Sequence, residues 1–584
     1  MALISKASLL MVPSTYEEGT LYNVLPSGNR APDSTDQNSG YDNTRADFTF
    51  DRGSNAAATR IGSDGLIKKY RENKLLQSNQ FDTTWARPNS SVTSGQSGYD
   101  GSNDAWLLSA TANFARIEQT NSSNGVVTLS VYAKAGTADW IMLRLTGSGF
   151  NDQQYFDLAN GTIGINRGCI AADIEDVGGG WYRCSATTDG PTLQYAIMYI
   201  ALADGNLSPT NENIYIQNAQ LESGMVSTDV LTSGATTAKA GVLIDLPRIN
   251  YDANGENGSL LLEPSRQQLV PYSELFSTAV GWSPQVVGSS TANVILNYGI
   301  SPDGYQNADR LQLALNGSSY ADWVSVLSVA SGTTYTYSVY AKSLSGNVDV
   351  KILGGTPTGN ILKEITTEWT RLTHTFTATS TALYPRFLLE GGTSSSADIL
   401  VFGAMLEAGS YATSYIPNHG TTGGVTRAAD SCSVTGVSDV IGQTEGTIFV
   451  DMNYTNTNNT LDATPFRVLG SGSAQMYVEI NTNETFEAVV VNSVGTLVFN
   501  STSASQSAGR KKMAIAYKGS DFAYYINGTQ IAVQTSGAFA SASLDSLRLG
   551  MYSSGVQVLA DSVNQATIFN ERLSNAELAT LTTL

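Results

Sequence analysis

Charged residues are scarce in this sequence, and positively charged ones are the scarcest. Only 14% of the 584 residues are charged, against about a quarter in ordinary globular chains. The 51 acidic residues outnumber the 32 lysines and arginines, which leaves a formal net charge of -19. Such a chain repels a phosphate backbone on average, so we expect no nucleic-acid partner.

Long hydrophobic runs are also missing. The apolar stretch nearest the start, SLLMV at residues 8–12, is far shorter than a membrane-spanning helix or the core of a signal peptide. No run of about 18 apolar residues occurs elsewhere. We therefore expect a soluble protein without a Sec signal and without membrane insertion.

Histidine and cysteine are too rare for most catalytic and zinc-binding sites. The sequence has 2 histidines and 3 cysteines, and it contains no Gly-x-Ser-x-Gly, His-Glu-x-x-His or Cys-x-x-Cys motif. His374 alternates within a strand-like segment, where we expect a structural role, and His419 lies in a glycine-rich loop. A carboxylate pair for glycoside hydrolysis stays open, because a sequence does not give distances between acids. We predict a protein that is not an enzyme and has no cofactor.

What the sequence does contain is a long internal repeat. The residues Ser-Val-Tyr-Ala-Lys occur at 130–134 and again at 338–342. Further landmarks recur around them in one order: Ser78, Phe81 and Trp85 with Ser273, Phe276 and Trp282, then Trp181 and Arg183 with Trp369 and Arg371, then Leu221 and Glu222 with Leu406 and Glu407. The spacing drifts between about 185 and 208 residues, as loop insertions in a common scaffold produce. Two homologous modules follow.

Alternation of apolar and polar residues with a period of two dominates these modules. In VVTLSVYAKA, one face carries Val127, Leu129, Val131 and Ala133, and the other carries Thr128, Ser130, Tyr132 and Lys134. Turn signals separate such segments at short intervals, which is typical of antiparallel sandwiches and jelly rolls. The end of the chain differs, because Ser574 and Glu577 form a capping box for one short helix. We predict an all-β, multidomain chain of antiparallel β-sandwiches, of which two are homologous jelly rolls.

The last part of the chain, from about residue 425, has landmarks of its own. A Tyr-x-N-G hairpin stands at Tyr525–Gly528, and the chain ends with Ile568, Asn570, Leu573, Ser574, Glu577 and Leu578 in a recurring order. This region resembles concanavalin A-like (laminin G-like) sandwiches. We therefore divide the chain into an attachment and oligomerisation segment (1–71), two jelly rolls (72–240 and 241–424) and a lectin-type sandwich (425–584).

The earlier part resembles the virion proteins of bacteriophages. The segments SLLMVPSTYEEGTLYNVLPSG, ADFTFDRGSNAAATRIGSDGLI, LPRINYDANGENGSLLLEPSRQQLVPYSELFSTAVGW and LEAGSYATSYIPNHGTTGGVTRAAD follow one another as in tail, fibre and appendage proteins. Arg60 and Arg427, each in a Thr-Arg step, and the pair Pro247-Arg248 mark the module boundaries. Proteins of this kind often carry carbohydrate-binding jelly rolls.

This resemblance implies a location in the virion and other virion proteins as partners. It also implies a closed homo-oligomer, with a trimer favoured, and attachment to host cell-surface polysaccharide. Two alternatives stay open: a purely structural capsid or tail decoration protein that binds no glycan, and a bacterial surface adhesin.

Candidate glycan-binding residues are aromatic and lysine side chains on sheet faces. A pyranose ring stacks on tryptophan or tyrosine, while polar neighbours bind its hydroxyl groups. The candidates are Tyr132, Lys134 and Trp140 in the first module, and Trp323, Tyr340 and Lys342 in the second. Because Trp140 and Trp323 do not align between the copies, we expect them in loops. The alternative for every ring is packing inside the sandwich.

One segment resembles a calcium-binding loop. In DANGENGSLLLE, Asp252, Asn254, Glu256 and Glu263 occupy positions one, three, five and twelve of that motif. The sixth position, however, is Asn257 instead of glycine. We interpret the segment as a hairpin turn before a strand. Structural calcium stays open without nominated ligands, and no metal site is predicted.

Overall fold

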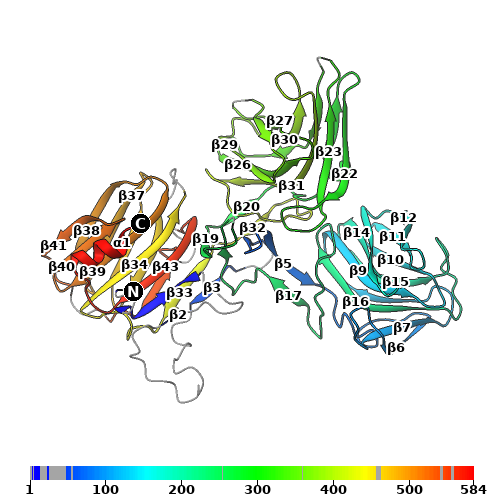
Figure 1. Ribbon diagram of the computed structural model, residues 1–584, viewed down its shortest axis with the longest axis horizontal. Helices are drawn as coiled ribbons and strands as arrows, with labels where there is room; N and C mark the ends of the chain where they lie inside the picture. Colours follow the sequence, from blue (N-terminus) through cyan, green and yellow to red (C-terminus); the bar gives the residue numbers. More distant parts are fainter. Residues whose placement is uncertain are drawn as a thin grey trace.

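The chain forms three β-sandwich lobes that meet at a small central hub (Figure 1). The computed structural model describes all residues except 1–2, 4–5, 14–22, 25–47, 54–56, 253, 318, 358, 456–461, 540–542 and 554–557. In the described residues the strands pair antiparallel and one α-helix, α1 (Asn575–Thr582), closes the chain. The predicted all-β, multidomain fold class is confirmed.

The right-hand lobe of Figure 1 is the first jelly roll. Its strands are β6 (Ser90–Gln96), β7 (Ala105–Ala110), β8 (Arg116–Thr120), β9 (Gly125–Ala135), β10 (Trp140–Gly147), β11 (Phe150–Asp157), β12 (Thr162–Arg167), β13 (Ala171–Gly178), β14 (Trp181–Gly190), β15 (Leu193–Ala201) and β16 (Asn213–Ser223). They form two sheets, in the orders β13-β14-β9-β16-β7-β6 and β12-β11-β10-β15-β8. Leu129, Val131 and Ala133 lie in the core between them, on the face that alternation predicts.

The upper lobe is the second jelly roll, and it repeats this topology. Its strands are β21 (Ser283–Val286), β22 (Thr291–Gly299), β23 (Ala308–Ala314), β24 (Ala321–Val324), β25 (Leu327–Ser328), β26 (Thr334–Ser343), β27 (Val348–Gly354), β28 (Leu362–Ile365), β29 (Thr370–Thr377), β30 (Ala382–Leu389) and β31 (Ser396–Ala408). The order β29-β26-β31-β23-β22 matches β14-β9-β16-β7-β6, and β28-β27-β30-β24 matches β11-β10-β15-β8. The repeat in the sequence is thus a repeat of strand order.

A buried polar cluster also recurs on the outer face of each jelly roll. Each cluster places an arginine over a tyrosine ring and joins a glutamate to a threonine hydroxyl: Arg183 over Tyr132 at 5.5 Å with Glu222 and Thr228 at 2.6 Å, and Arg371 over Tyr340 at 5.5 Å with Glu407 and Thr413 at 2.7 Å. In both copies the arginine also donates to the carbonyl of that threonine. The repeated landmarks Arg183/Arg371 and Glu222/Glu407 therefore fix the segment that covers this face.

The left-hand lobe is the C-terminal sandwich. Its own strands are β33 (Ser431–Thr435), β34 (Glu445–Tyr454), β35 (Ala463–Leu469), β36 (Gln475–Ile480), β37 (Thr485–Val491), β38 (Leu497–Ser505), β39 (Gly509–Lys518), β40 (Asp521–Ile526), β41 (Thr529–Gln534), β42 (Ser546–Leu549) and β43 (Asp561–Phe569). The predicted capping box of α1 is present, since Ser574 accepts from the Glu577 amide and Glu577 accepts from the Ser574 amide. No helix in the described part of the chain is long and apolar enough to cross a membrane.

Strands of the N-terminal segment pair with strands of this C-terminal sandwich. Much of the predicted attachment segment lies outside the described residues. Of its described strands, β1 (Leu9–Met11) pairs with β2 (Asn23–Val24) and with β43, and β3 (Thr49–Asp51) pairs with β33. Leu9 and Met11 lie in the core of the sandwich. These strands are therefore ordered by the chain's own C-terminal lobe, whereas the sequence suggested a separate segment.

The hub joins the three lobes through short strands. They are β4 (Thr59–Ile61), β5 (Ile67–Asn73), β17 (Ala238–Gly241), β18 (Ile249–Asn250), β19 (Ser259–Leu262), β20 (Arg266–Gln268) and β32 (Val425–Arg427). β5 pairs with β4 and β17, β19 pairs with β43, and β20 pairs with β32. Segments from the start, middle and end of the chain thus meet in one place.

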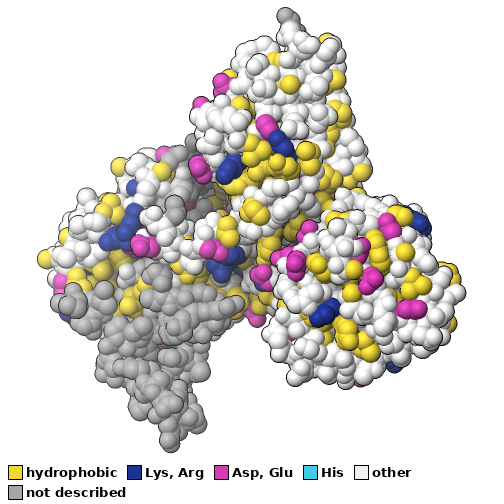
Figure 2. All heavy atoms as spheres, turned by 45° about the vertical axis from the view of Figure 1, so that its right-hand side comes forward, with side chains coloured by type: hydrophobic (Ala, Val, Ile, Leu, Met, Phe, Trp, Pro, Cys, Tyr) yellow, Lys and Arg dark blue, Asp and Glu magenta, His cyan; other side chains and the backbone are white. Residues whose placement is uncertain are grey.

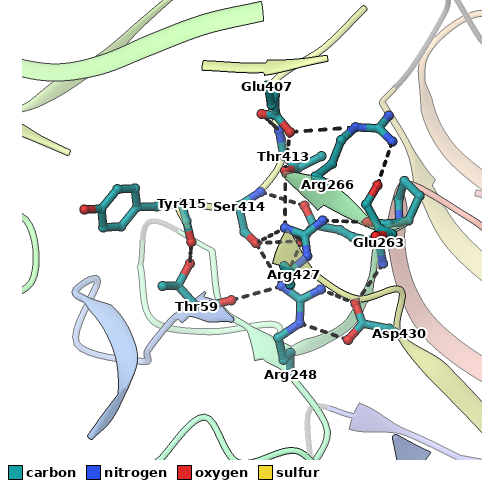
Figure 3. A network of polar contacts seen from close by, with 12 residues as sticks. Thr59, Arg248, Glu263, Arg266, Glu407, Thr413, Ser414, Tyr415, Arg427 and Asp430 are labelled. Atoms are coloured by element: carbon teal, nitrogen blue, oxygen red, sulfur yellow. Dashed lines mark hydrogen bonds and ion pairs between the residues drawn. The ribbon is translucent and has the colours of Figure 1, made fainter. Parts of the chain in front are cut away.

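A buried ionic network lies inside the hub (Figure 3). Glu263 accepts from Arg248 at 2.8 Å and forms an ion pair with Arg427 at 3.0 Å. Arg248 also pairs with Asp430, and Ser414 donates its amide to Glu263 at 2.7 Å. Burial opposes ionisation of Glu263, but Arg427 and Arg248 outweigh burial and lower the pKa of this carboxyl to about 2. Two of the three arginines that mark module boundaries in the sequence, Arg248 and Arg427, are thus ions of this network, whereas Arg60 donates to the Ile249 carbonyl.

The two jelly rolls also touch each other directly. Val126 and Met225 of the first jelly roll pack with Leu275 of the second in one buried apolar cluster. The Val126 amide donates to the carbonyl of His419 at 2.7 Å. On the face in Figure 2, hydrophobic side chains gather where these two lobes meet, and charged side chains are few and scattered. His419, the loop histidine of the sequence, therefore has a place in this contact.

Candidate functional site

The outer face of the larger sheet in the C-terminal sandwich changes character halfway along its strands. At one end, Phe449 on β34 and Phe569 on β43 pack beneath Leu578 of α1. Two and four residues beyond Phe449, the same face of β34 carries Asp451 and Asn453. The helix covers the apolar half, and the polar half is left beside the hub.

A groove of about 620 Å³ lies over this polar half. One wall is the sheet itself, and the other is the hairpin between β18 and β19. The polar side chains that line the groove come from both walls: Asn250, Tyr251, Asp252, Asn257 and Ser259 from the hairpin, and Asp451, Asn453, Arg510, Ser562, Asn564 and Gln565 from the sheet. A groove of this size accommodates one or two sugar rings.

A carboxylate and a guanidinium form the centre of the sheet wall. Arg510 donates to both oxygens of Asp451, from Nε to Oδ1 at 2.8 Å and from Nη2 to Oδ2 at 2.6 Å. The Asn564 amide also donates to Asp451 Oδ1 at 3.1 Å. Asp451 is only 1% exposed, whereas the Arg510 side chain is 53% exposed. The carboxylate is therefore fixed in place, and the guanidinium faces the groove.

Two asparagine side chains lie next to this ion pair. Asn453 Nδ2 donates to Asn564 Oδ1 at 3.2 Å, and Asn564 Nδ2 donates to Asn453 Oδ1 at 3.1 Å. Asn453 also donates to the Ser562 hydroxyl at 3.1 Å. The register explains this grouping, because Asn453 lies between Arg510 on β39 and Ser562 on β43. Both N–H donors of each amide are used in these contacts, and the capacity that remains for a ligand is a lone pair on each side-chain oxygen.

The hairpin wall contains the segment that resembles a calcium loop. Asp252 Oδ1 accepts from the amides of Asn254 at 3.0 Å and Glu256 at 2.9 Å, and Oδ2 accepts from Asn257 Nδ2 at 2.7 Å. These hydrogen bonds, led by that of Asn257, lower the pKa of Asp252. Glu263 instead points into the ionic hub. The segment is a hairpin turn, as the sequence indicates. Its first position, Asp252, lines the groove, and its last position, Glu263, belongs to the ionic network of the hub.

Metal ligands do not gather in the described part of the chain. No group of three or more histidine, cysteine, aspartate or glutamate side chains among the described residues is arranged to hold a metal ion. The groove combines amides, hydroxyls, one ion pair and the half-buried ring of Tyr251. Such a set of neutral donors and acceptors beside an aromatic ring suits a polyhydroxylated ligand.

The candidates from the first jelly roll lie far from this groove in the fold. Tyr132 is 8% exposed, because the ring of Tyr99 stacks on it at 3.7 Å. Lys134 donates to the Gly179 carbonyl at 2.7 Å. Trp140 opens β10 and packs half-buried against a small apolar cluster. The structure gives Tyr132 the packing role that the sequence left open as the alternative.

The candidates from the second jelly roll are similarly dispersed. Trp323 is 2% exposed and donates Nε1–H to the Phe276 carbonyl at 3.0 Å. Tyr340 is half-buried against Phe402 and Tyr415, and Lys342 is half-buried on β26. The expectation that Trp140 and Trp323 lie in loops is wrong, since both are strand residues. The six candidates do not form one site.

The groove residues were missed because no single segment contains them. A signal was present in GTIFVDMNY and DSVNQATIF, where polar residues stand at the non-core positions of otherwise apolar strands. An outward face that is polar is normally solvated, so this signal gains meaning only when the hairpin is placed opposite it.

Comparisons with known proteins give no family for this chain. No family model matches it, and no curated protein matches it. Among solved structures, the carbohydrate-binding module CBM40 of the Ruminococcus gnavus IT-sialidase, bound to alpha2,3 sialyllactose, is 18% identical with a TM-score of 0.22, covering 26% of this chain and 91% of that one. Domain 4 of AbnA, an arabinanase of Geobacillus stearothermophilus in complex with arabinotriose, is 14% identical with a TM-score of 0.20, covering 26% of this chain and 73% of that one.

A third similar solved structure is a pentraxin. The heptameric SAP-like pentraxin of Limulus polyphemus is 10% identical with a TM-score of 0.19, covering 24% of this chain and 70% of that one. At these values the similarities identify no ligand for this chain. Its candidate function therefore depends on the residues of the groove.

Proposed function

We propose that this chain is a non-enzymatic structural protein of a bacteriophage virion, a fibre or appendage, that attaches to glycans on the host surface. The observation that carries the glycan part is the groove, in which Asp451, Asn453, Asn564 and Arg510 meet the hairpin that bears Tyr251. The virion part is supported by the phage-like sequence segments of residues 1–430, which follow one another in the same order as in phage tail, fibre and appendage proteins.

The groove residues have complementary roles toward a sugar. The side-chain oxygens of Asn453 and Asn564 each keep a lone pair that can accept from a sugar hydroxyl group, because the N–H donors of both amides are used within the protein. Arg510 uses Nε and Nη2 on Asp451, which leaves Nη1 for the ligand. The Tyr251 ring provides a surface for the apolar face of a pyranose. None of these roles includes a bond-breaking step.

We also propose how the parts of the chain share this work. Residues 1–71 contribute to attachment within the virion, residues 72–240 and 241–424 contain the two jelly rolls, and residues 425–584 form the sandwich that supplies the sheet wall of the groove. Fibres and appendages are usually symmetric oligomers, and we favour a trimer with other virion proteins as partners. A shallow sugar site binds in the micromolar to millimolar range, and several copies recover affinity through avidity.

The glycan part is tested with two groove variants and a matched control. In Asn453→Ala and Asn564→Ala, loss of the amide pair should abolish binding of host surface polysaccharide in a surface plasmon resonance assay. Asn500→Ala is the control, since Asn500 is exposed on β38 of the opposite sheet. Unchanged binding in both groove variants, with melting temperatures like that of the wild type, would contradict the proposal.

The competing function is a structural decoration protein that binds no glycan. The burial of Tyr132 and Trp323 favours it, because Trp323 lies in the core of the second jelly roll and Tyr132 is covered by Tyr99 on the outer face of the first. Cryo-electron microscopy of the intact particle distinguishes virion locations from one another, and absence of the chain from the particle would instead favour a bacterial surface adhesin.

A further inference from the structure

We infer that the groove accepts uncharged glycans and discriminates against glycans that carry carboxylate or sulfate groups. This inference rests on the proposed function and names the class of ligand for the same site. It follows from the charged side chains that line the groove and from the groups to which each of them is hydrogen-bonded or ion-paired.

The groove has one cationic side chain among its described lining residues, and that cation is already neutralised. Arg510 and Asp451 form a two-pronged ion pair, with Nη2 and Oδ2 at 2.6 Å. Hydrogen bonding to Asp451 raises the pKa of Arg510. The pair contributes no net charge, so an anionic sugar that reaches the remaining Nη1 of Arg510 gains little net attraction, because the Asp451 carboxylate stays beside the guanidinium and is held by Asn564 as well.

The opposite wall carries a charge that is not neutralised. Among the described residues, the Asp252 carboxylate accepts hydrogen bonds only from amide groups, those of Asn254, Glu256 and Asn257. Neutral donors stabilise the ionised form without cancelling its charge, so the pKa of Asp252 is lowered and the carboxylate is ionised at neutral pH. The lining of the groove therefore has a net charge of about -1.

Charges just outside the groove are of both signs, because Arg60, which donates to the Ile249 carbonyl at 3.2 Å at the base of the hairpin, is offset by an acidic residue of the turn. Glu256, in the same turn, is exposed and acidic. Lys512 is the next cation along the outer face of β39, and it donates to the Thr583 carbonyl beyond α1 at 2.8 Å. The whole chain adds a formal charge of -19. An acidic glycan meets repulsion both at long range and at the groove.

The remaining lining groups suit hydroxyl and acetamido groups. Asn453, Asn564, Ser562 and Gln565 are neutral and half-buried, with both donors and acceptors. Hydroxyl groups can satisfy donors and acceptors at once, whereas a carboxylate only accepts. Hexoses and N-acetylhexosamines therefore fit the groove better than uronic acids, sialic acids or sulfated sugars.

The experiment compares probes that differ only in the acidic group. Suitable pairs are oligogalactosides with oligogalacturonates, and N-acetyllactosamine with its sialylated form, presented to the full chain at low ionic strength. We expect the neutral member of a pair to bind more tightly by about fivefold or more, which is the effect of one unit charge about 4 Å from the ligand in water. Added salt should narrow the difference.

Asp252→Asn connects the difference to the groove. Asparagine keeps the side-chain oxygen that accepts from the Asn254 and Glu256 amides but removes the charge. The variant should raise the affinity for the acidic probes to nearly that for the neutral probes. The control Asp349→Asn, at an exposed position of β27 in the second jelly roll, should leave both affinities unchanged.

The outcomes separate this inference from the proposed function. Equal or tighter binding of the acidic probes, abolished by Asn453→Ala, would overturn the inference and leave glycan attachment standing. If neither the neutral nor the acidic probes bind the chain, both the inference and the proposed function are overturned. A neutral preference that Asp252→Asn does not change would also overturn the inference, because the charge on the hairpin would not be its source.

Discussion

The ionic hub allows a quantitative prediction, because Glu263 is a buried carboxylate between two arginines. We consider Glu263→Gln, which keeps the shape of the side chain and an oxygen that accepts from Ser414. The variant removes the charge opposite Arg248 and Arg427. Three buried guanidinium groups, those of Arg52, Arg248 and Arg427, would then lie around the carboxylate of Asp430.

The pKa of Glu263 sets the magnitude. It falls from 4.5 to about 2 in the folded chain, which corresponds to about 3 kcal/mol of stabilisation at neutral pH. Removing one partner of a buried ion pair typically costs about 3–5 kcal/mol, which agrees. Because the folded-state pKa is depressed, this stabilisation is present above pH 4.5 and is lost as the pH falls toward about 2.

Differential scanning calorimetry between pH 3 and pH 8 measures the effect. The wild type should lose stability through this acidic range, and Glu263→Gln should be less stable at pH 7 and depend less on pH. Glu368→Gln, at an exposed position of the second jelly roll, is the control and should change stability by less than about 0.5 kcal/mol. If Glu263→Gln unfolds like the wild type at pH 7, the hub does not hold the lobes together.

Three further predictions concern Tyr132, Asp561 and the oligomeric state. Tyr132→Ala should destabilise the first jelly roll by about 3–5 kcal/mol in a chemical unfolding experiment, because the ring is buried under Tyr99; glycan binding without such a loss would restore Tyr132 as a site residue. Burial raises the pKa of Asp561 to about 7, so its ionisation should cost stability as the pH rises from 4 to 7, and Asp561→Asn should be at least as stable as the wild type at pH 8; a large loss there would contradict this. The full chain should sediment as a trimer in analytical ultracentrifugation, and a monomer at micromolar concentration would refute the proposed oligomer.

The features that local patterns encode were predictable from the sequence. The two Ser-Val-Tyr-Ala-Lys copies became equivalent strands, β9 and β26, because alternation fixes which face of a strand enters the core. The capping box from Ser574 to Glu577 became the start of α1 for the same reason, since a cap depends only on nearby residues.

The features that depend on long-range pairing were not predictable. β1 pairs with β43, which lies more than 550 residues away in the sequence. A short N-terminal strand is therefore added to a sheet formed by the opposite end of the chain. Tyr132 looks like a free ring on a polar face, and the stacking of Tyr99 upon it is invisible in the sequence. The groove requires β34, β39, β43 and a distant hairpin together. Residue types on a strand show which positions face outward, but not what lies opposite them.

A crystal structure of the full chain with a bound oligosaccharide from the host surface tests the central claim most directly. We predict density for a sugar in the groove, stacked on Tyr251 and within hydrogen-bonding distance of Asn453 and Asn564. Density over the jelly rolls at Trp140 or Tyr340, with an empty groove in the same crystal, would contradict the account.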